Sequence, residues 1–248
     1  MAFLARTFSR LLNRIGLLCV RTNHPASHYL RHLPASAFET VLFRLFPDQQ
    51  GLRFIQIGAN DGRRADPLQI FIDKHDWSGI MIEPLSKNFA DLLLHRGASS
   101  PRIQLRQAAV DLVAGRRLVF DLSPTATSNL PDWTRGLASF SRERVAQAAS
   151  ELGLPDTAII SEEIDTITWA QVWSEFGSRP CDLLTLDTEG YDLTLLRAAS
   201  LAEHKPRIIH FEHACTTPED RYAFYRELEQ LGYEIATDGP DTTAWLQP

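Results

Sequence analysis

The sequence predicts an α/β domain in which helices cover both faces of an open, mostly parallel β-sheet. From Phe54 onward, short apolar runs alternate with helical patterns, as in chains that pass repeatedly between a parallel sheet and its covering helices. The chain has 248 residues, of which 44% are hydrophobic and 23% are charged, and this suits one domain with a substantial core. We therefore expect a domain over residues 51–248, preceded by an extension over residues 1–50.

The extension differs from the domain in charge and in pattern. Residues 1–38 hold five arginines and no acidic residue, so they carry +5 while the rest of the chain carries −11. Apolar residues recur there at helical intervals, at Leu4, Phe8, Leu11, Leu12, Ile15 and Leu18. This pattern predicts a basic amphipathic helix. Over residues 1–22 it would pack against the domain or a partner subunit, or lie on a membrane surface.

Five short apolar runs are the predicted parallel strands, at residues 53–57, 79–82, 103–106, 182–186 and 207–211. Two helices are expected to begin where a capping residue precedes a proline, at Asp66-Pro67 and Thr217-Pro218. Residues 233–236 and 243–246 flank a turn-rich segment, which predicts a C-terminal antiparallel hairpin.

One interval interrupts this alternation of strands and helices. Residues 121–155 combine prolines, a glycine and several Ser, Thr and Asn residues before a helical stretch at residues 142–152. We interpret the interval as an insertion that covers the active site.

Composition also limits the function and the location. The formal net charge of −6 disfavours a nucleic-acid partner and favours a small-molecule substrate. The three cysteines, Cys19, Cys181 and Cys215, outline neither a disulfide framework nor a zinc site, which suits a reducing compartment. No apolar run approaches the roughly 18 residues of a membrane span. We expect a cytoplasmic protein, peripheral to a membrane at most.

Polar and small residues follow every predicted parallel strand. They are Gly58 to Gly62 (GANDG), Glu83-Pro84, Gln107-Ala108, Asp187 to Gly190 (DTEG) and Glu212-His213, in chain order. Ligands of open α/β sheets bind at the carboxyl ends of the strands, so these residues are expected to line one rim.

The turn after the first strand indicates a cofactor that contains a nucleoside. Gly58 and Gly62 permit a tight turn, and Glu83, 21 residues beyond Gly62, is placed to accept the hydroxyl groups of a ribose. The G-x-x-x-G spacing differs from the G-x-G-x-x-G of dinucleotide sites. Asp61 would repel a pyrophosphate but suits the cationic S-adenosylmethionine, unless it only stabilises the turn.

Several motifs together resemble the FkbM-type methyltransferases. They are IGANDG (57–62), DPL (66–68), WSGIMIEP (77–84), AAV (108–110), LDTEGYD (186–192), FEH (211–213), LGY (231–233) and DTTA (241–244). The resemblance spans roughly residues 53–246 and implies a Rossmann-like class I methyltransferase fold, S-adenosylmethionine as cofactor and methylation of a hydroxyl oxygen on a sugar, glycan or other natural product.

The resemblance also implies roles for individual residues. Gly58, Ala59, Asn60, Asp61 and Gly62 would form the cofactor turn, Glu83 and Pro84 would lie at the ribose, and Gln107 and Ala108 near the adenine. Many related enzymes carry an acid where this chain has Gln56. Contact with the methionine amino group would then fall to Asp187 or Asp61.

Transfer to a hydroxyl requires a group that takes the proton. The candidates are Asp187, Glu189, Glu212 and His213, and histidine is the most natural base because its ordinary pKa lies near neutrality. No spacing demands a metal ion, so none is predicted. Two alternatives remain, a nicotinamide-dependent oxidoreductase and a cofactor-binding module without catalytic activity.

Overall fold

The computed structural model describes residues 36–64, 66–97, 101–130, 134 and 136–247. The amphipathic helix expected within residues 1–22, and Cys19, lie outside these residues. Within the described part of the chain, no helix combines the length and the apolar character that crossing a bilayer requires.

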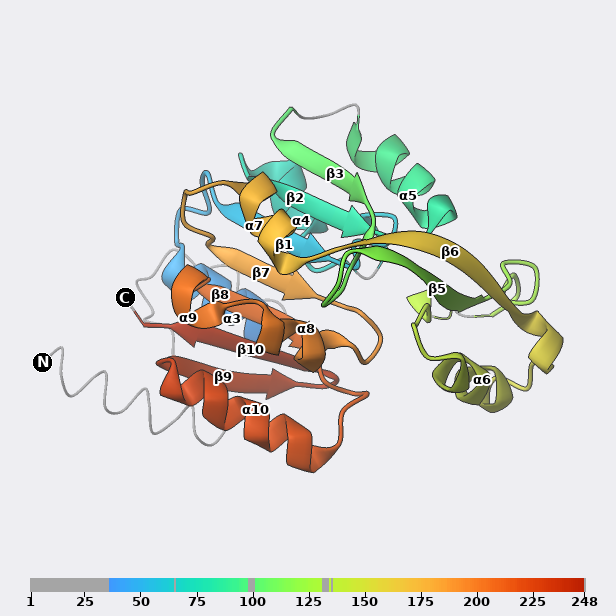
Figure 1. Cartoon of the computed structure of the whole chain (residues 1–248). Helices are drawn as coiled ribbons and strands as arrows, with labels where there is room; N and C mark the ends of the chain where they lie inside the picture. The colour runs from blue at the N-terminus through green and yellow to red at the C-terminus, as the bar shows by residue number, and fades with distance from the viewer. Residues whose placement is uncertain (1–35, 65, 98–100, 131–133, 135, 248) are drawn as a thin grey trace, which may run out of the picture.

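The centre of the molecule is a seven-stranded sheet in the order β3-β2-β1-β7-β8-β10-β9 (Figure 1). The strands are β1 (Arg53–Ile57), β2 (Ser78–Glu83), β3 (Ile103–Gln107), β7 (Leu183–Leu186), β8 (Ile208–Glu212), β9 (Tyr233–Asp238) and β10 (Asp241–Leu246). Strands β3 to β8 of this order pair in parallel, and β10 runs antiparallel to both β8 and β9. The predicted parallel sheet with a C-terminal antiparallel hairpin is confirmed.

Helices cover both faces of the sheet, as predicted. One face carries α3 (Ala37–Leu45), α4 (Gln69–Lys74) and α5 (Ser86–Leu92), and the other carries α7 (Trp169–Phe176), α8 (Asp192–Ala198), α9 (Leu201–His204) and α10 (Pro218–Gln230). Because side chains alternate along a strand, Phe54 of β1 packs in the cluster under α3 and α4, whereas Ile55 packs under α7 and α8. A short π-helix, Leu93–Gly97, follows α5.

The two predicted helix starts have different outcomes. Thr217 caps α10 by accepting from the amide of Asp220, and Pro218 occupies the first turn, as predicted. The predicted start at Asp66-Pro67 is wrong, because α4 begins at Gln69. Asp66 instead accepts from the amide of Leu68 at 2.8 Å and from the side chain of Gln56 at 3.0 Å, which holds it in a turn before the helix.

A second, smaller sheet was not predicted. It has the order β4-β6-β5 and consists of β4 (Ala109–Val110), β5 (Gly115–Leu122) and β6 (Ile159–Ile167). The antiparallel β5–β6 ribbon projects from the main sheet, with α6 (Arg142–Glu151) and a 3-10 turn (Asp156–Ala158) at its outer end (Figure 1). We call residues 115–167 the arm. Its strands are largely exposed and carry cross-strand ion pairs such as Arg116–Glu163, 2.9 Å apart.

Candidate active site

A cavity of about 590 Å³ lies at the carboxyl ends of β1, β2, β7 and β8, where the sequence predicts a ligand. Residues 136–140 and Arg144 of the arm close it on one side. Its volume is within the range of small-molecule sites, roughly 300–1,000 Å³. Nine of the predicted site residues line it, namely Gly58, Ala59, Asn60, Glu83, Pro84, Ala108, Asp187, Glu189 and Glu212.

The turn after β1 is tight because Gly58 lies against the end of β7. A Cβ atom on Gly58 would come within 1.9 Å of the carbonyl oxygen of Asp187, and its φ of +78° is one that glycine adopts without strain. The amides of Gly58 and Ala59 both donate to the carbonyl of Ile82 on β2, at 2.9 and 3.0 Å. The turn therefore ties together the ends of three neighbouring strands.

Glu83, at the end of β2, reaches into the same turn. Its carboxylate accepts from the amide of Asn60 at 2.9 Å and from the amide of Leu85 at 3.0 Å. Glu83 is only 4% exposed. Burial raises the pKa of Glu83 to about 7. Hydrogen bonds from ligand hydroxyl groups would favour its charged form.

Asp61 and Gly62 do not line the cavity, although they belong to the predicted cofactor turn. Asp61 accepts from the amides of Arg63 and Arg64 and pairs with the Arg64 guanidinium at 2.9 Å. Although burial acts in the opposite direction, these amides hold the pKa of Asp61 below its ordinary value. Asp61 thus stabilises the turn, which is the alternative that its sequence position left open.

Four carboxylates line the cavity around the ends of β7, β8 and β10, namely Asp187, Glu189, Glu212 and Asp241, and we call them the carboxylate cluster. Burial raises all four pKa values, and repulsion within the cluster adds to the effect for Glu189, Glu212 and Asp241. The pKa reaches about 7 at Glu189, about 8 at Glu212 and about 6 at Asp241. The cluster can therefore take up protons near neutral pH.

Within the cluster, Glu189 combines a positive φ with a hydrogen bond from an arginine. Its φ of +53° is uncommon for a residue other than glycine, and strained backbone of this kind is concentrated at functional sites. Its side chain accepts from Arg144 of α6 at 3.0 Å. The arm is thereby tied to the rim of the main sheet at this residue.

One group of potential metal ligands occurs among the described residues. Side-chain atoms of Glu189, Glu212 and Cys215 lie within 4.8 Å of one another. The guanidinium of Arg144 contacts both Glu189 and the sulfur of Cys215, and so supplies positive charge at this point. We assign no metal to these residues, because the guanidinium of Arg144 already contacts two of the three.

His213 and Gln107, two further predicted site residues, do not line the cavity. His213 is 6% exposed, and its Nδ1 lies 2.9 Å from the hydroxyl of Thr242 on β10. Gln107 is exposed and donates to the hydroxyl of Ser86 at 2.9 Å. Their predicted roles in catalysis and adenine binding gain no support from this geometry.

The cavity also contains residues that the sequence did not assign to it. They include Gln56, Arg64, Asp66, Asn88, Arg144, Thr185, Tyr191, His210 and Asp241. Tyr191 and Asp241 lie inside the LDTEGYD and DTTA motifs, so these motifs could have predicted that both residues belong to the site. Arg144 carried no such signal, because only the fold of the arm brings it to the rim.

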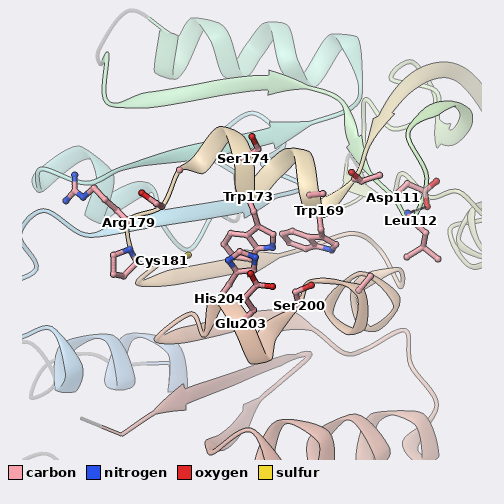
Figure 2. Close-up of a pocket in the computed structure, with 16 residues that line it drawn as sticks. Asp111, Leu112, Trp169, Trp173, Ser174, Arg179, Cys181, Ser200, Glu203 and His204 are labelled. Carbon is pink, nitrogen blue, oxygen red and sulfur yellow. Dashed lines mark hydrogen bonds between the residues drawn. The ribbon is translucent and has the colours of Figure 1, made fainter.

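A larger hollow, of about 970 Å³, runs along α7 on the face of the sheet and is separate from the carboxyl rim (Figure 2). Its floor includes Trp169 and Trp173, whose indole N–H groups donate to the backbone carbonyls of Leu195 and Ala199. Trp173 also stacks on His204, with the ring centroids 3.9 Å apart. The indole and imidazole groups named here therefore already have partners within the protein. We place the function in the smaller cavity at the carboxyl rim.

The strand order, the glycine turn after β1 and the buried acid at the end of β2 define a class I S-adenosylmethionine-dependent methyltransferase. The chain belongs to the FkbM methyltransferase domain family, whose sequence model matches residues 56–235. Its cofactor is therefore S-adenosylmethionine. The cavity fits this cofactor, since it presents buried carboxylates and unpaired acceptor oxygens to a ligand that is cationic and rich in hydrogen-bond donors. Membership of this family contradicts the alternative that the chain is a nicotinamide-dependent oxidoreductase.

Several solved structures are similar to the chain. The FkbM methyltransferase of Methylobacillus flagellatus KT is 15% identical with a TM-score of 0.46, and the match covers 79% of this chain and 44% of that one. The putative RNA methyltransferase PH1948 of Pyrococcus horikoshii is 10% identical with a TM-score of 0.40 and coverages of 83% and 78%. The N-terminal domain of human METTL16 is 11% identical with a TM-score of 0.44 and coverages of 92% and 72%.

The chain thus spans less than half the length of the Methylobacillus flagellatus protein. A comparison with curated protein sequences found no match.

Proposed function

We propose that the protein methylates a hydroxyl oxygen of a small molecule, such as a sugar, a glycan or another natural product. The observation that carries the proposal is the carboxylate cluster, which shares one cavity with the cofactor turn. A hydroxyl group must lose its proton when its oxygen is methylated, and carboxylates whose pKa lies near neutrality accept protons efficiently. The net charge of −6 favours a small molecule over a nucleic acid as acceptor.

When bound, S-adenosylmethionine supplies an electrophilic methyl group, and its transfer to an acceptor oxygen leaves a neutral thioether and one released proton. Glu189 is our choice to take that proton. Its pKa is about 7, its φ of +53° indicates a functional constraint, and Arg144 fixes its carboxylate. Asp187 and Glu212 would then orient the acceptor hydroxyl beside it.

The proposal is tested by incubating the protein with methyl-¹³C S-adenosylmethionine and a panel of hydroxylated sugars and polyketides. The ¹³C shift of the product tells a methyl group on oxygen from one on nitrogen or carbon. An O-methylated product supports the proposal. A product methylated only on nitrogen or carbon contradicts it, and cofactor binding without any product favours the module that lacks catalytic activity.

With an accepted substrate, Glu189→Gln should lower kcat by roughly 10²- to 10⁴-fold, because glutamine keeps the shape but cannot take the proton. Binding of S-adenosylhomocysteine, measured by calorimetry, should change little. Glu163→Gln, the same substitution in an exposed ion pair of the arm, is the matched control. Should His213→Gln abolish turnover while Glu189→Gln remains active, the base would be the histidine instead.

A further inference from the structure

Three buried polar side chains line the cavity from the sheet face that α4 covers. Gln56 of β1 and Thr185 of β7 are direct partners in the sheet, and Asp66 lies in the turn before α4. Gln56 is 5% exposed, Thr185 is 3% exposed, and the Asp66 side chain is 2% exposed. We call these three residues the Asp66 pocket.

Each residue of the Asp66 pocket has one buried oxygen without a hydrogen-bond partner. These atoms are Oε1 of Gln56, Oδ2 of Asp66 and Oγ1 of Thr185. The other carboxylate oxygen of Asp66 is occupied, because it accepts from Nε2 of Gln56 at 3.0 Å and from the amide of Leu68 at 2.8 Å. An unpaired buried acceptor is unfavourable, and three of them in residues that line one cavity point to a ligand that donates hydrogen bonds.

The nearby arginine does not fill this role. Arg96 lies 3.9 Å from Oδ2 of Asp66, beyond hydrogen-bond distance. Its guanidinium instead donates to the carbonyl oxygen of Gly62 at 2.7 Å and to the carboxylate of Asp73. Oδ2 of Asp66 therefore has no hydrogen-bond partner within the protein. Burial also raises the pKa of Asp66, and a cation bound beside it would favour the charged carboxylate.

Three acceptor oxygens, one of which belongs to a carboxylate, match an ammonium group, which has three N–H donors and a positive charge. We propose that Asp66, oriented by Gln56, binds the α-ammonium of the methionine part of the cofactor. This inference rests on S-adenosylmethionine being the cofactor. Arg64, which also lines the cavity, would face the α-carboxylate with the guanidinium nitrogens that its pairing with Asp61 leaves free.

The Asp66 pocket contains the position at which the family resemblance implies an acid. An acid is expected at residue 56, and this chain has glutamine there. Of the two candidates named above, Asp61 is committed to the turn and does not line the cavity, whereas Asp187 lines it at the end of β7. Asp66 supplies the carboxylate from the neighbouring turn, and Gln56 holds it through a 3.0 Å hydrogen bond.

The test compares two ligands by titration calorimetry. S-Adenosylhomocysteine carries the amino-acid end, whereas 5′-methylthioadenosine keeps the adenosine and the sulfur but lacks that end. Asp66→Asn should weaken binding of S-adenosylhomocysteine on the order of 10- to 100-fold, as expected for the loss of a charged hydrogen bond. Binding of 5′-methylthioadenosine should be unchanged.

Two further variants sharpen the comparison. Asp73→Asn removes an exposed carboxylate that contacts the same Arg96, and it should leave both affinities unchanged. Combining Gln56→Glu with Asp66→Asn moves the carboxylate to the other side of the hydrogen bond, and it should restore most of the lost affinity for S-adenosylhomocysteine. Recovery of this kind would not follow from a purely structural role of Asp66.

Four results would overturn the proposal. An unchanged affinity of Asp66→Asn for S-adenosylhomocysteine, or an equal loss for both ligands, excludes Asp66 as the ammonium partner while the methyltransferase assignment stands. A wild-type chain that binds neither ligand contradicts the cofactor itself. If Asp66→Asn does not fold, wild-type protein is titrated with S-adenosylhomocysteine lacking its α-amino group, and equal binding of this analogue overturns the proposal.

Discussion

Glu83, Glu189 and Glu212 lie in one cavity and have pKa values of about 7, 7 and 8, against an ordinary value of 4.5. The first cause in each case is burial, and for Glu189 and Glu212 neighbouring carboxylates add repulsion. The cofactor is cationic, so its binding opposes both effects. The protonation of single residues is thus coupled to occupation of the site.

The raised pKa values predict how stability depends on pH. Between pH 4.5 and about 8, the folded chain binds more protons at these residues than the unfolded chain does, so the free energy of unfolding should fall as pH rises through that range. Thermal unfolding of the ligand-free protein from pH 5.5 to 8.5 checks this.

The Glu212→Gln variant should show a shallower decline than the wild type, because glutamine does not titrate. Glu163→Gln, in the exposed ion pair of the arm, serves again as the control. A free energy of unfolding that rises with pH over the same range would contradict the raised pKa values of these glutamates.

At the scale of elements, the cofactor turn depends on the close approach of the ends of β1 and β7. The approach is possible because Gly58 has no Cβ atom, and the carbonyl of Asp187 occupies the space that a Cβ would need. The amides of Gly58 and Ala59 complete the link to β2. The turn is therefore held by backbone contacts before any ligand binds, which should limit the conformational entropy that binding removes.

Gly58→Ala should lower the free energy of unfolding by roughly 1–3 kcal/mol or more, since it adds an overlap with backbone to an unfavourable φ. Gly153→Ala is the matched control, because Gly153 has a φ of +70° and no atom within 4 Å of the added methyl group. Denaturant unfolding of both variants isolates the overlap. Equal losses would mean that backbone strain alone matters at Gly58.

On the scale of the whole molecule, the two parts of the chain carry opposite charge. Residues 1–38 carry +5 and the remainder carries −11, so attraction favours contact between the extension and the acidic domain, its own or that of a partner subunit. A membrane surface is the alternative for the predicted amphipathic helix. A cytoplasmic location stays a proposal, as does the division into an extension and one domain.

Deletion of residues 1–22 tests these contacts. We expect the 248-residue chain and the shortened one to bind anionic vesicles equally, which is the outcome if the predicted helix packs on protein. The shortened chain should then unfold at a lower temperature or sediment as a smaller species. Vesicle binding by the longer chain alone, at matched ionic strength, would instead assign the helix to a membrane surface.

The main sheet could be predicted because its strands are short apolar runs, and β1 matches the predicted residues 53–57. The β5–β6 ribbon could not, since its exposed, charged strands are defined by pairing across the arm and not by an apolar face. The rim residues followed from strand ends, whereas the contact between His213 and Thr242 joins two residues far apart in the chain. Tertiary contacts of this kind leave no local pattern.

The carboxylate cluster has a consequence for the exchange of product for substrate. S-Adenosylmethionine carries a sulfonium charge, and S-adenosylhomocysteine does not, so the attraction exerted by Asp187, Glu189 and Glu212 disappears once the methyl group has left. Arg144, paired with Glu189, limits this difference without cancelling it. With the sulfonium beside this cluster, electrostatics at the rim should oppose product inhibition, and the spent cofactor should leave a site that still attracts its replacement.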